Sequence, residues 1–409
     1  MRYRSVALLA ATAATLAVAA TACGTANEAP GSGSAPASRA ALAAGGFLDP
    51  GYTLYVADTG ALTVTPVDLS NDKPGTPYQM AVSPAALAIS SSGTTVYVGN
   101  NWGYAGNNGG FVGAVQGTTM TTIDVVSGKV GRPIPAGEGP MGIAVSHDDK
   151  WALVADMGLM DYSKLIAAAP PKITRAVLTR YVTVTDARTL SVIDLTTHRL
   201  AKSLDVGPGP AAVTVTPDGK YAWVADSAAP QDAQGYVTRV NLSTWAIGPT
   251  IKVGVGPMAV AITPNGKWAY VTNSGWWTVP GHTVTPINLT TLTAAKPIRV
   301  GTGPISIAIT PNGKQALVAN YGWGFRGGGT VTPIDLVTGK AGKAIRVGPG
   351  PATVAITPDG KVAYVGVAGV VNQVGDTVVP INLRTDKAGP PIHAGMSPGA
   401  LVIGRTPHR

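Results

Sequence analysis

A 47-residue repeat dominates the second half of this chain. Most copies begin with a proline, pass through a Pro-Asp/Asn-Gly-Lys turn and end on a short apolar run, as in PMAVAITPNGKWAYVTN from Pro257. The leading prolines at this spacing are Pro210, Pro257, Pro304, Pro351 and Pro398. Two more copies begin at Pro84 and Pro140 and are enlarged by insertions, which makes seven copies. A period of about 40 to 50 residues is typical of solenoids and propellers.

Each copy contains four segments typical of β-strands, here called strands a to d. Strand a is the VAIT-type run, strand b the YVTN-like run, strand c the TVTPIDL-type run and strand d the PIRVG-type run. The Pro-Asp/Asn-Gly-Lys tetrad between a and b predicts a tight hairpin, and we expect a type I′ turn because Asp/Asn-Gly accepts positive φ. Four antiparallel strands per copy predict an all-β fold, a seven-bladed β-propeller.

The two ends of the repeat predict how the ring closes. The region from Tyr52 contains strands b, c and d without an a, and the copy from Pro398 supplies a strand a alone. We expect this C-terminal strand to complete the N-terminal blade. Such pairing removes the aggregation hazard that open strand edges present.

The N-terminal residues predict export. Arg2 and Arg4 precede an apolar run of about 15 residues, which is typical of a signal peptide and short for a membrane span. The small residues before Cys23 and Gly24 after it resemble a bacterial lipobox, although Ala20 stands where that pattern prefers Leu. We expect Cys23, the only cysteine, to be lipidated. An ordinary signal peptide with an incidental cysteine is the alternative.

These features predict three parts of the chain. Residues 1–22 are the signal peptide, residues 23–46 the lipidated cysteine with a flexible Gly/Ser/Pro/Ala tether, and residues 47–409 a single propeller. We expect an extracytoplasmic monomer that reaches the membrane by its lipid anchor only. The formal charge without residues 1–22 is about +7, with no run of five basic residues, so nucleic-acid binding is not expected.

The VTN at 271–273 and the ITPDGK/AYV spacing resemble the YVTN-type repeat of bacterial exported propeller proteins. The resemblance covers about 52–404 and implies a fold more than a function. Relatives of this broad class include surface-layer proteins, binding scaffolds, lactonases and a streptogramin-type lyase. Three functions therefore stay open: ligand or partner binding, a metal-dependent lactonase- or lyase-like activity, and a structural role in the cell envelope.

Two positions carry Asp or Asn in nearly every copy. The first lies in strand c, at Asp68, Asp124, Asp194, Asn241, Asn288, Asp335 and Asn382, where we expect side-chain bonds to the backbone rather than a metal ring. The second ends strand b, at Asp58, Asn100, Asp156, Asp226, Asn273 and Asn320, with Gly366 as the exception. We expect these side chains to cap the b–c loop. The alternative is a divalent cation near Asp58, Asp156 and Asp226, because hard cations take clustered oxygens; no other cofactor is expected.

The b–c loops contain the candidate binding residues: Trp102, Tyr104, Trp276, Trp277, His282, Tyr321, Trp323 and Arg326. Two of these loops are enlarged, at about 101–118 and 157–188, and we expect them to form one wall over the channel mouth, with a short helix at Tyr162–Ala169. Clustered loop aromatics indicate recognition, here of an unknown protein, glycan or small-molecule ligand. The alternative is that the rings pack on one another and close the funnel.

No residue is predicted to be catalytic. The seven strand a segments contain neither an acid nor a histidine, and no Ser, Cys and His arrangement for nucleophilic catalysis is visible. The alternative is that loops supply catalytic residues, and the candidates are then His282 with Glu138 or Asp226. Trp151, Trp223 and Trp268 lie in or beside strand b, where we expect them to pack within the blades.

Overall fold

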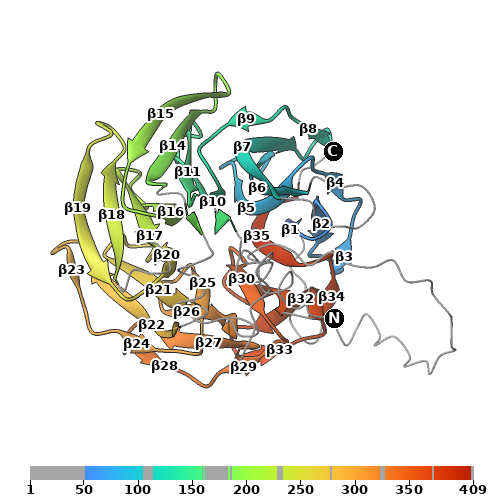
Figure 1. Ribbon diagram of the computed structural model, residues 1–409. Helices are drawn as coiled ribbons and strands as arrows, with labels where there is room; N and C mark the ends of the chain where they lie inside the picture. The colour runs from blue at the N-terminus through green and yellow to red at the C-terminus, as the bar shows by residue number, and fades with distance from the viewer. Residues whose placement is uncertain are drawn as a thin grey trace, which may run out of the picture.

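The computed structural model describes residues 51–104, 114–158, 160–161, 183–184, 187–227, 234–276, 279–322, 328–370 and 373–406, with the backbone alone at 102–104, 114–116, 160–161 and 183–184. Seven antiparallel sheets of four or five strands are arranged as blades around one axis, which confirms the predicted seven-bladed β-propeller (Figure 1). Within these residues there is no α-helix, and hence none long and apolar enough to cross a membrane.

The first four blades follow the chain in order, except for one strand of blade 1. Blade 1 contains β1 (Tyr52–Asp58), β2 (Thr63–Asp68), β3 (Lys73–Pro74), β4 (Tyr78–Gln79) and β35 (Pro398–Arg405). Blade 2 contains β5 (Ser83–Ile89), β6 (Thr95–Tyr104), β7 (Ala114–Asp124), β8 (Lys129–Val130) and β9 (Ile134–Pro135). Blade 3 contains β10 (Pro140–Val145), β11 (Trp151–Asp156), β14 (Thr189–Asp194) and β15 (Arg199–Asp205). Blade 4 contains β16 (Pro210–Val215), β17 (Tyr221–Asp226), β18 (Gly235–Asn241) and β19 (Ile247–Val253).

The last three blades repeat one pattern closely. Blade 5 contains β20 (Pro257–Ile262), β21 (Trp268–Trp276), β22 (Val279–Asn288), β23 (Thr293–Ala294) and β24 (Ile298–Arg299). Blade 6 contains β25 (Pro304–Ile309), β26 (Gln315–Asn320), β27 (Thr330–Asp335), β28 (Lys340–Ala341) and β29 (Ile345–Arg346). Blade 7 contains β30 (Pro351–Ile356), β31 (Val362–Val370), β32 (Gln373–Asn382), β33 (Lys387–Ala388) and β34 (Ile392–His393).

The hydrophobic core lies between neighbouring blades. Each inner strand contacts the inner strands on both sides, so β35, β5, β10, β16, β20, β25 and β30 form a closed ring. Strand b is covered on both faces, which is why its sequence is apolar almost throughout. Val213 of blade 4 packs with Leu153 of blade 3, and the fully buried Trp223 packs with Val260 of blade 5. Trp223 therefore packs between blades 4 and 5, and not only within its own blade as the sequence predicts.

The C-terminal strand closes the ring as predicted. β35 pairs with β1 along its length, from Tyr52 opposite Arg405 to Asp58 opposite Pro398. One further bond extends the pairing, because the Thr406 amide donates to the Gly51 carbonyl at 2.9 Å. The first and last parts of the chain thus share one sheet.

The a–b turn differs from the predicted type I′ geometry. In blade 4 the Gly219 amide donates to the Thr216 carbonyl at 2.8 Å, and Gly219 alone in this turn has positive φ, at 68°. The turn is therefore type I followed by a left-handed glycine. A type I′ turn is ruled out because it needs positive φ at the first central position, where the ring of Pro217 holds φ negative.

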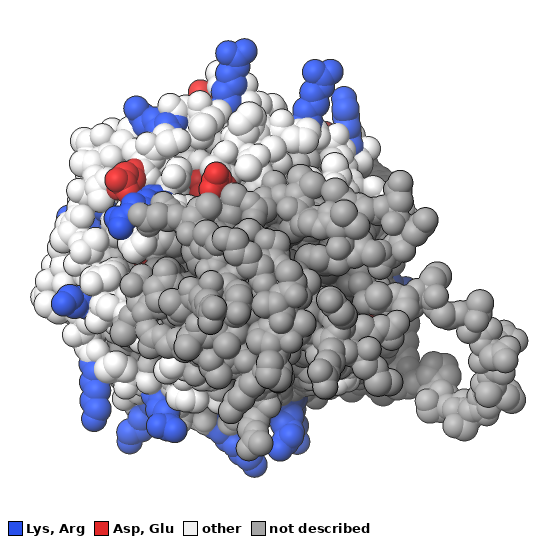
Figure 2. All heavy atoms as spheres, in the orientation of Figure 1, with Lys and Arg blue, Asp and Glu red and all other residues white. Residues whose placement is uncertain are grey.

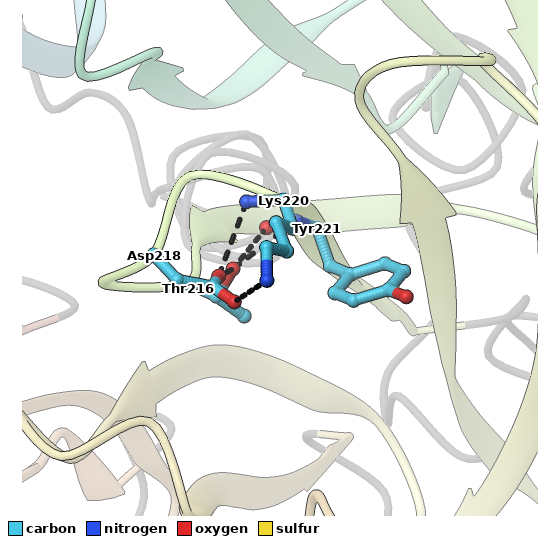
Figure 3. A network of polar contacts seen from close by, with 4 residues as sticks. All are labelled: Thr216, Asp218, Lys220 and Tyr221. Carbon is cyan, nitrogen blue, oxygen red and sulfur yellow. Dashed lines mark hydrogen bonds and ion pairs between the residues drawn. The ribbon is translucent and has the colours of Figure 1, made fainter.

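Side-chain bonds hold this turn closed (Figure 3). The Asp218 carboxylate accepts from the Thr216 hydroxyl at 2.6 Å and from the Lys220 amide at 3.1 Å, while the Tyr221 amide donates to Thr216 Oγ1 at 3.1 Å. The same set of bonds recurs in blades 3, 5, 6 and 7, with Ser146, Thr263, Thr310 and Thr357 in the place of Thr216. These turns are a repeated scaffold.

Strand d is continuous in two blades and broken in five. β15 and β19 each run for seven residues, whereas the other blades have two short outer strands. Strand c explains four of the breaks, because a proline there has no N–H to donate to strand d. These prolines are Pro66, Pro286, Pro333 and Pro380, and blades 3 and 4 have Val192 and Arg239 at the same position. In blade 2 the break coincides with Gly131 and Pro133 in strand d itself.

Removal of the closing strand provides a test of this architecture. A protein truncated after Ser397 loses every bond of β35 to β1 and leaves buried side chains such as Leu54 uncovered. We expect loss of the cooperative thermal transition. A synthetic peptide spanning 398–406 should restore it in a concentration-dependent way, measured by circular dichroism. A truncated protein that melts like the full chain would contradict closure by this strand.

Candidate functional site

The face that carries the b–c loops also carries the irregular parts of the propeller. In blades 2, 5 and 7 the pairing of strands b and c continues past the end of the sheet into the b–c loop. The last pairs are Tyr104 opposite Ala114, Trp276 opposite Val279 and Val370 opposite Gln373. The insertion of blade 3 contains an extra strand pair, β12 (Met160–Asp161) with β13 (Thr183–Val184). Blades 2, 5 and 7 therefore extend hairpins from this face, and blade 3 adds a separate one.

The structure describes some of the predicted ligand residues fully, some by their backbone alone and others not at all. Trp276 ends β21 and Tyr321 follows β26, and their side chains are 2% and 4% exposed. His282 lies in β22, is half-buried, and its carbonyl accepts from the Val300 amide at 2.8 Å. Trp102 and Tyr104 have only their backbone described, in β6. Trp277, Trp323, Arg326, Cys23 and the segment Tyr162–Ala169 lie outside the described residues, as do most of the two enlarged loops.

The Asp and Asn side chains that end strand b point into the blades. They do not cap the b–c loop; they bond across the hairpin to hydroxyl groups of strand c. Asn273 Nδ2 lies 2.9 Å from Thr283 Oγ1 and 2.8 Å from Thr285 Oγ1. Its Oδ1 accepts from the Gly254 amide at 2.9 Å, so one side chain joins strands b and c to the d–a linker. Gly254 is required there, because a Cβ atom would lie 2.5 Å from the Asn273 side chain.

The same arrangement recurs with an acid in three blades. Thr65, Ser191 and Thr238 donate to Asp58, Asp156 and Asp226, and all three carboxyl groups are fully buried. One oxygen of each carboxyl has no hydrogen-bond partner among the described residues. Burial disfavours the charged form, which raises the pKa of each group from 3.8 to about 7. The sequence does not reveal these pKa shifts. Three blades have Asp and three have Asn at this position, and the residue type alone does not show that the side chain is buried.

Blade 7 lacks this interaction. The residue opposite Pro351 is Val367, so the position that departs from the pattern is Val367 and not the predicted Gly366. Val379 stands where other blades have the second hydroxyl, and both valines are buried. The polar pair is thus replaced by an apolar pair, which avoids an unpaired buried polar group. This exchange supports a structural role for the whole ring.

The strand c ring caps strand ends, as predicted. In each blade the side-chain oxygen accepts from backbone amides two or three residues later, as Asp194 does from Thr196 at 2.8 Å and Thr197 at 3.0 Å. The same bonds occur at Asp68, Asp124, Asn241, Asn288, Asp335 and Asn382. Backbone and side-chain donors lower the pKa of Asp194.

The structure does not bring the catalytic candidates His282, Glu138 and Asp226 together as one cluster. The Asp226 carboxyl is bonded to Thr238 within its own blade, and Glu138 is exposed in the d–a linker of blade 2. Among the residues that the structure describes, no three His, Cys, Asp or Glu side chains lie close enough to hold a metal ion. The suggested cation near Asp58, Asp156 and Asp226 therefore has no shared cluster of ligands in this part of the chain.

A pocket of about 460 Å³ opens on the opposite face. It lies where blade 1 meets blade 2, and Tyr52, Thr94, Val126, Arg405 and Thr406 line it. The lining comes from turns and strand ends of the closing sheet and its neighbour. Sequence reasoning missed this pocket, because it arises from the meeting of the two ends of the chain.

Comparison with known proteins supports the fold. No protein-family model matches the sequence, and no curated protein matches it. Hydrazine synthase of Kuenenia stuttgartiensis has a similar structure, with a TM-score of 0.63 and 20% identity over 82% of this chain and 93% of that one. A functionally unknown protein from Desulfotomaculum acetoxidans DSM 771 gives 0.64 and 11%, over 86% and 99%. The periplasmic gluconolactonase PpgL of Pseudomonas aeruginosa gives 0.59 and 18%, over 87% and 99%. At these identities the likeness shows the propeller fold alone.

The buried carboxyl groups predict a stability that depends on pH. Because their pKa in the folded protein is raised to about 7, their contribution is fully present below about pH 4 and is lost as pH rises through 7. A tenfold difference in proton affinity between the folded and unfolded states corresponds to about 1.4 kcal/mol in the free energy of unfolding. We expect the melting temperature to fall between pH 5 and pH 8. In the D58N/D156N/D226N variant it should change much less.

The repeat provides the reverse control. Asn100, Asn273 and Asn320 occupy the same position, so Asn fits there without rearrangement. The substitution N273D should introduce a pH dependence of the same sign. A wild-type melting temperature that is constant from pH 5 to pH 8 would show that the carboxyls titrate normally.

Proposed function

We propose that this protein is an extracytoplasmic, lipid-anchored propeller of the YVTN type that binds a ligand or a partner protein through its b–c loop face. The observation that carries the proposal is the difference between the two faces. The a–b turns repeat one set of bonds in five blades, whereas extended hairpins and an extra strand pair occur on the b–c side of blades 2, 3, 5 and 7. Rigid scaffolds carry recognition on loops that vary in this way.

Buried aromatic side chains support a preformed site. Trp276 is the last residue of β21 and Tyr321 directly follows β26, and both side chains have almost no exposed surface, so the scaffold is well packed where these two strands end. A site built on a well-packed scaffold loses less conformational entropy when a ligand binds. In this proposal the contacts to the ligand come from Trp102, Tyr104, Trp277, Trp323 and Arg326, with His282 beside them.

A lactonase- or lyase-like enzyme is the second candidate. The raised pKa of Asp58, Asp156 and Asp226 favours it, because perturbed carboxyl groups are frequent at catalytic sites. Against it, each carboxyl is bonded to a hydroxyl of its own blade and Asn replaces it in three others. We therefore rank binding first.

Thermal shift with a ligand panel tests the binding proposal. The purified protein is melted with glycans, muropeptides, lactones and divalent cations, each with and without chelator. A ligand at about a hundred times its Kd should stabilise the fold by about 2.7 kcal/mol. The variant W102A/W277A/W323A should lose the ligand-induced shift. Without ligand, its melting temperature should equal that of the wild type. Trp276 is left intact, because truncating a buried Trp costs about 3 to 5 kcal/mol.

Trp245 provides the matched control. It lies in the c–d turn on the opposite face and packs edge-on against Trp151, with ring centroids 5.4 Å apart. The W245A variant should retain the ligand-induced shift. A shift that persists in the triple variant would place the ligand elsewhere. Lactone turnover that is abolished by D226N would favour the enzyme, and the absence of any shift would favour a structural envelope protein.

A further inference from the structure

The positive charge of this protein is concentrated on its outer strands. We define the basic belt as the outermost segment of each blade, residues 73–79, 129–135, 199–205, 247–253, 293–299, 340–346 and 387–393. These segments contain twelve Lys and Arg residues and one acid, Asp205. Their excess of eleven positive charges is larger than the formal charge of the whole chain, +9. The remaining residues together are therefore slightly acidic.

The belt is densest in blades 5 and 6, with five of the twelve cations, and most regular in blades 5 to 7. Its side chains there are Lys296, Arg299, Lys340, Lys343, Arg346 and Lys387, and all six are exposed. Equivalent positions of successive blades carry the same charge, as Lys296 with Lys343, Arg299 with Arg346, and Lys340 with Lys387. Outer strands of neighbouring blades touch here, β19 with β23, β24 with β28 and β29 with β33. Figure 2 shows Lys and Arg along the lower rim, where Figure 1 places these strands, with no Asp or Glu visible among them.

These cations are not neutralised within the protein. Among the described residues, the Lys side chains that form ion pairs with Asp are Lys150, Lys220 and Lys361. All three lie at a–b turns, outside the basic belt, and their partners are the turn residues Asp148, Asp218 and Asp359. One further ion pair among the described residues includes a residue of the belt, His393, which lies 2.9 Å from Asp376. The six Lys and Arg side chains of blades 5 to 7 form no such pair in this part of the chain, so they present their charge to the surroundings.

Protection of strand edges explains part of this charge. Charged side chains on outer strands, lysine above all, prevent edge-to-edge association. Edge protection does not require Lys and Arg to return at the same positions of successive blades, as they do in blades 5 to 7, with a single acid against twelve cations in the belt. This regular arrangement is suited to contact with negative charge.

The shape of the belt selects among anionic partners. Each blade turns the outer surface by one-seventh of a circle, so a planar membrane can touch only a small part of the belt at once. A flexible chain can follow the curved rim across several blades and meet the repeated cations one after another. We propose that the basic belt of blades 5 to 7 binds a flexible linear polyanion, a polymer with phosphate or carboxylate groups along its length. This surface differs from the loop face, and its test does not depend on the function proposed there.

Charge reversal on the belt tests this proposal in the full protein. The K296E/R299E/K343E/R346E variant keeps charged side chains on the outer strands, so protection of the edges remains. The probes are long-chain inorganic polyphosphate and poly-L-glutamate, with orthophosphate as the monomeric control. Affinity is measured by fluorescence anisotropy over a salt series. The wild type should bind both polymers far more tightly than orthophosphate and weaken with salt, because salt screens exposed charges. The belt variant should lose at least about tenfold in affinity.

The matched control changes the same net charge away from the belt. The variant K150E/K220E/K267E/K314E alters lysines of the a–b turns, and its polymer affinity should stay within about threefold of the wild type. Thermal melting confirms that both variants are folded. Equal losses in the two variants would overturn the proposal, since net charge alone would then decide binding. Tighter binding to phosphatidylglycerol vesicles than to either polymer would overturn it in favour of a membrane, and no binding to either polymer would reject it.

Discussion

Pairing between β1 and β35 is the interaction on which the rest of this propeller depends. The inner strands of all blades contact their neighbours in a closed ring, and the core lies between blades rather than within any one of them. A blade alone leaves both of its faces exposed, so no blade is stable before its neighbours are in place. Because the last strand to be made completes the first sheet, the ring is sealed by one long-range contact.

Within each blade, a buried side chain at the end of strand b performs a second joining role. Six blades use Asp or Asn with hydroxyl groups of strand c, and blade 7 uses Val367 with Val379. The two partners change together, because a polar group left alone in this position would lose its hydrogen bonds to water without replacement. The three acids are the costly version of the interaction above neutral pH, and the three asparagines make equivalent bonds without titration.

The fold was predictable from the sequence because the same four-strand pattern recurs in every blade. Repetition identified the blades, the closing strand and the caps of strand c, and each is confirmed. Repetition misleads in three places. A type I′ turn conflicts with the fixed φ of Pro217, and the repeat position of blade 7 is Val367 and not Gly366. The Asp and Asn side chains that end strand b bond to strand c instead of capping the b–c loop. The burial of Trp276 and the raised pKa of Asp58 depend on neighbours from distant parts of the chain, which a local pattern does not contain. The candidate site lies where the repeat is broken, so repetition offers the least information about it.

The direction of the closing pair determines how the ring responds to tension. Tyr52 lies opposite Arg405, so the chain enters and leaves the sheet at the same end of the β1–β35 pair. A force that pulls the two ends apart would open these bonds one at a time, like a zipper, instead of shearing them together. A load applied through the N-terminal segment alone does not act across this pair. A protein pulled by one end only can therefore bear the load while its ring stays closed. A protein pulled by both ends would lose the β1–β35 pairing first.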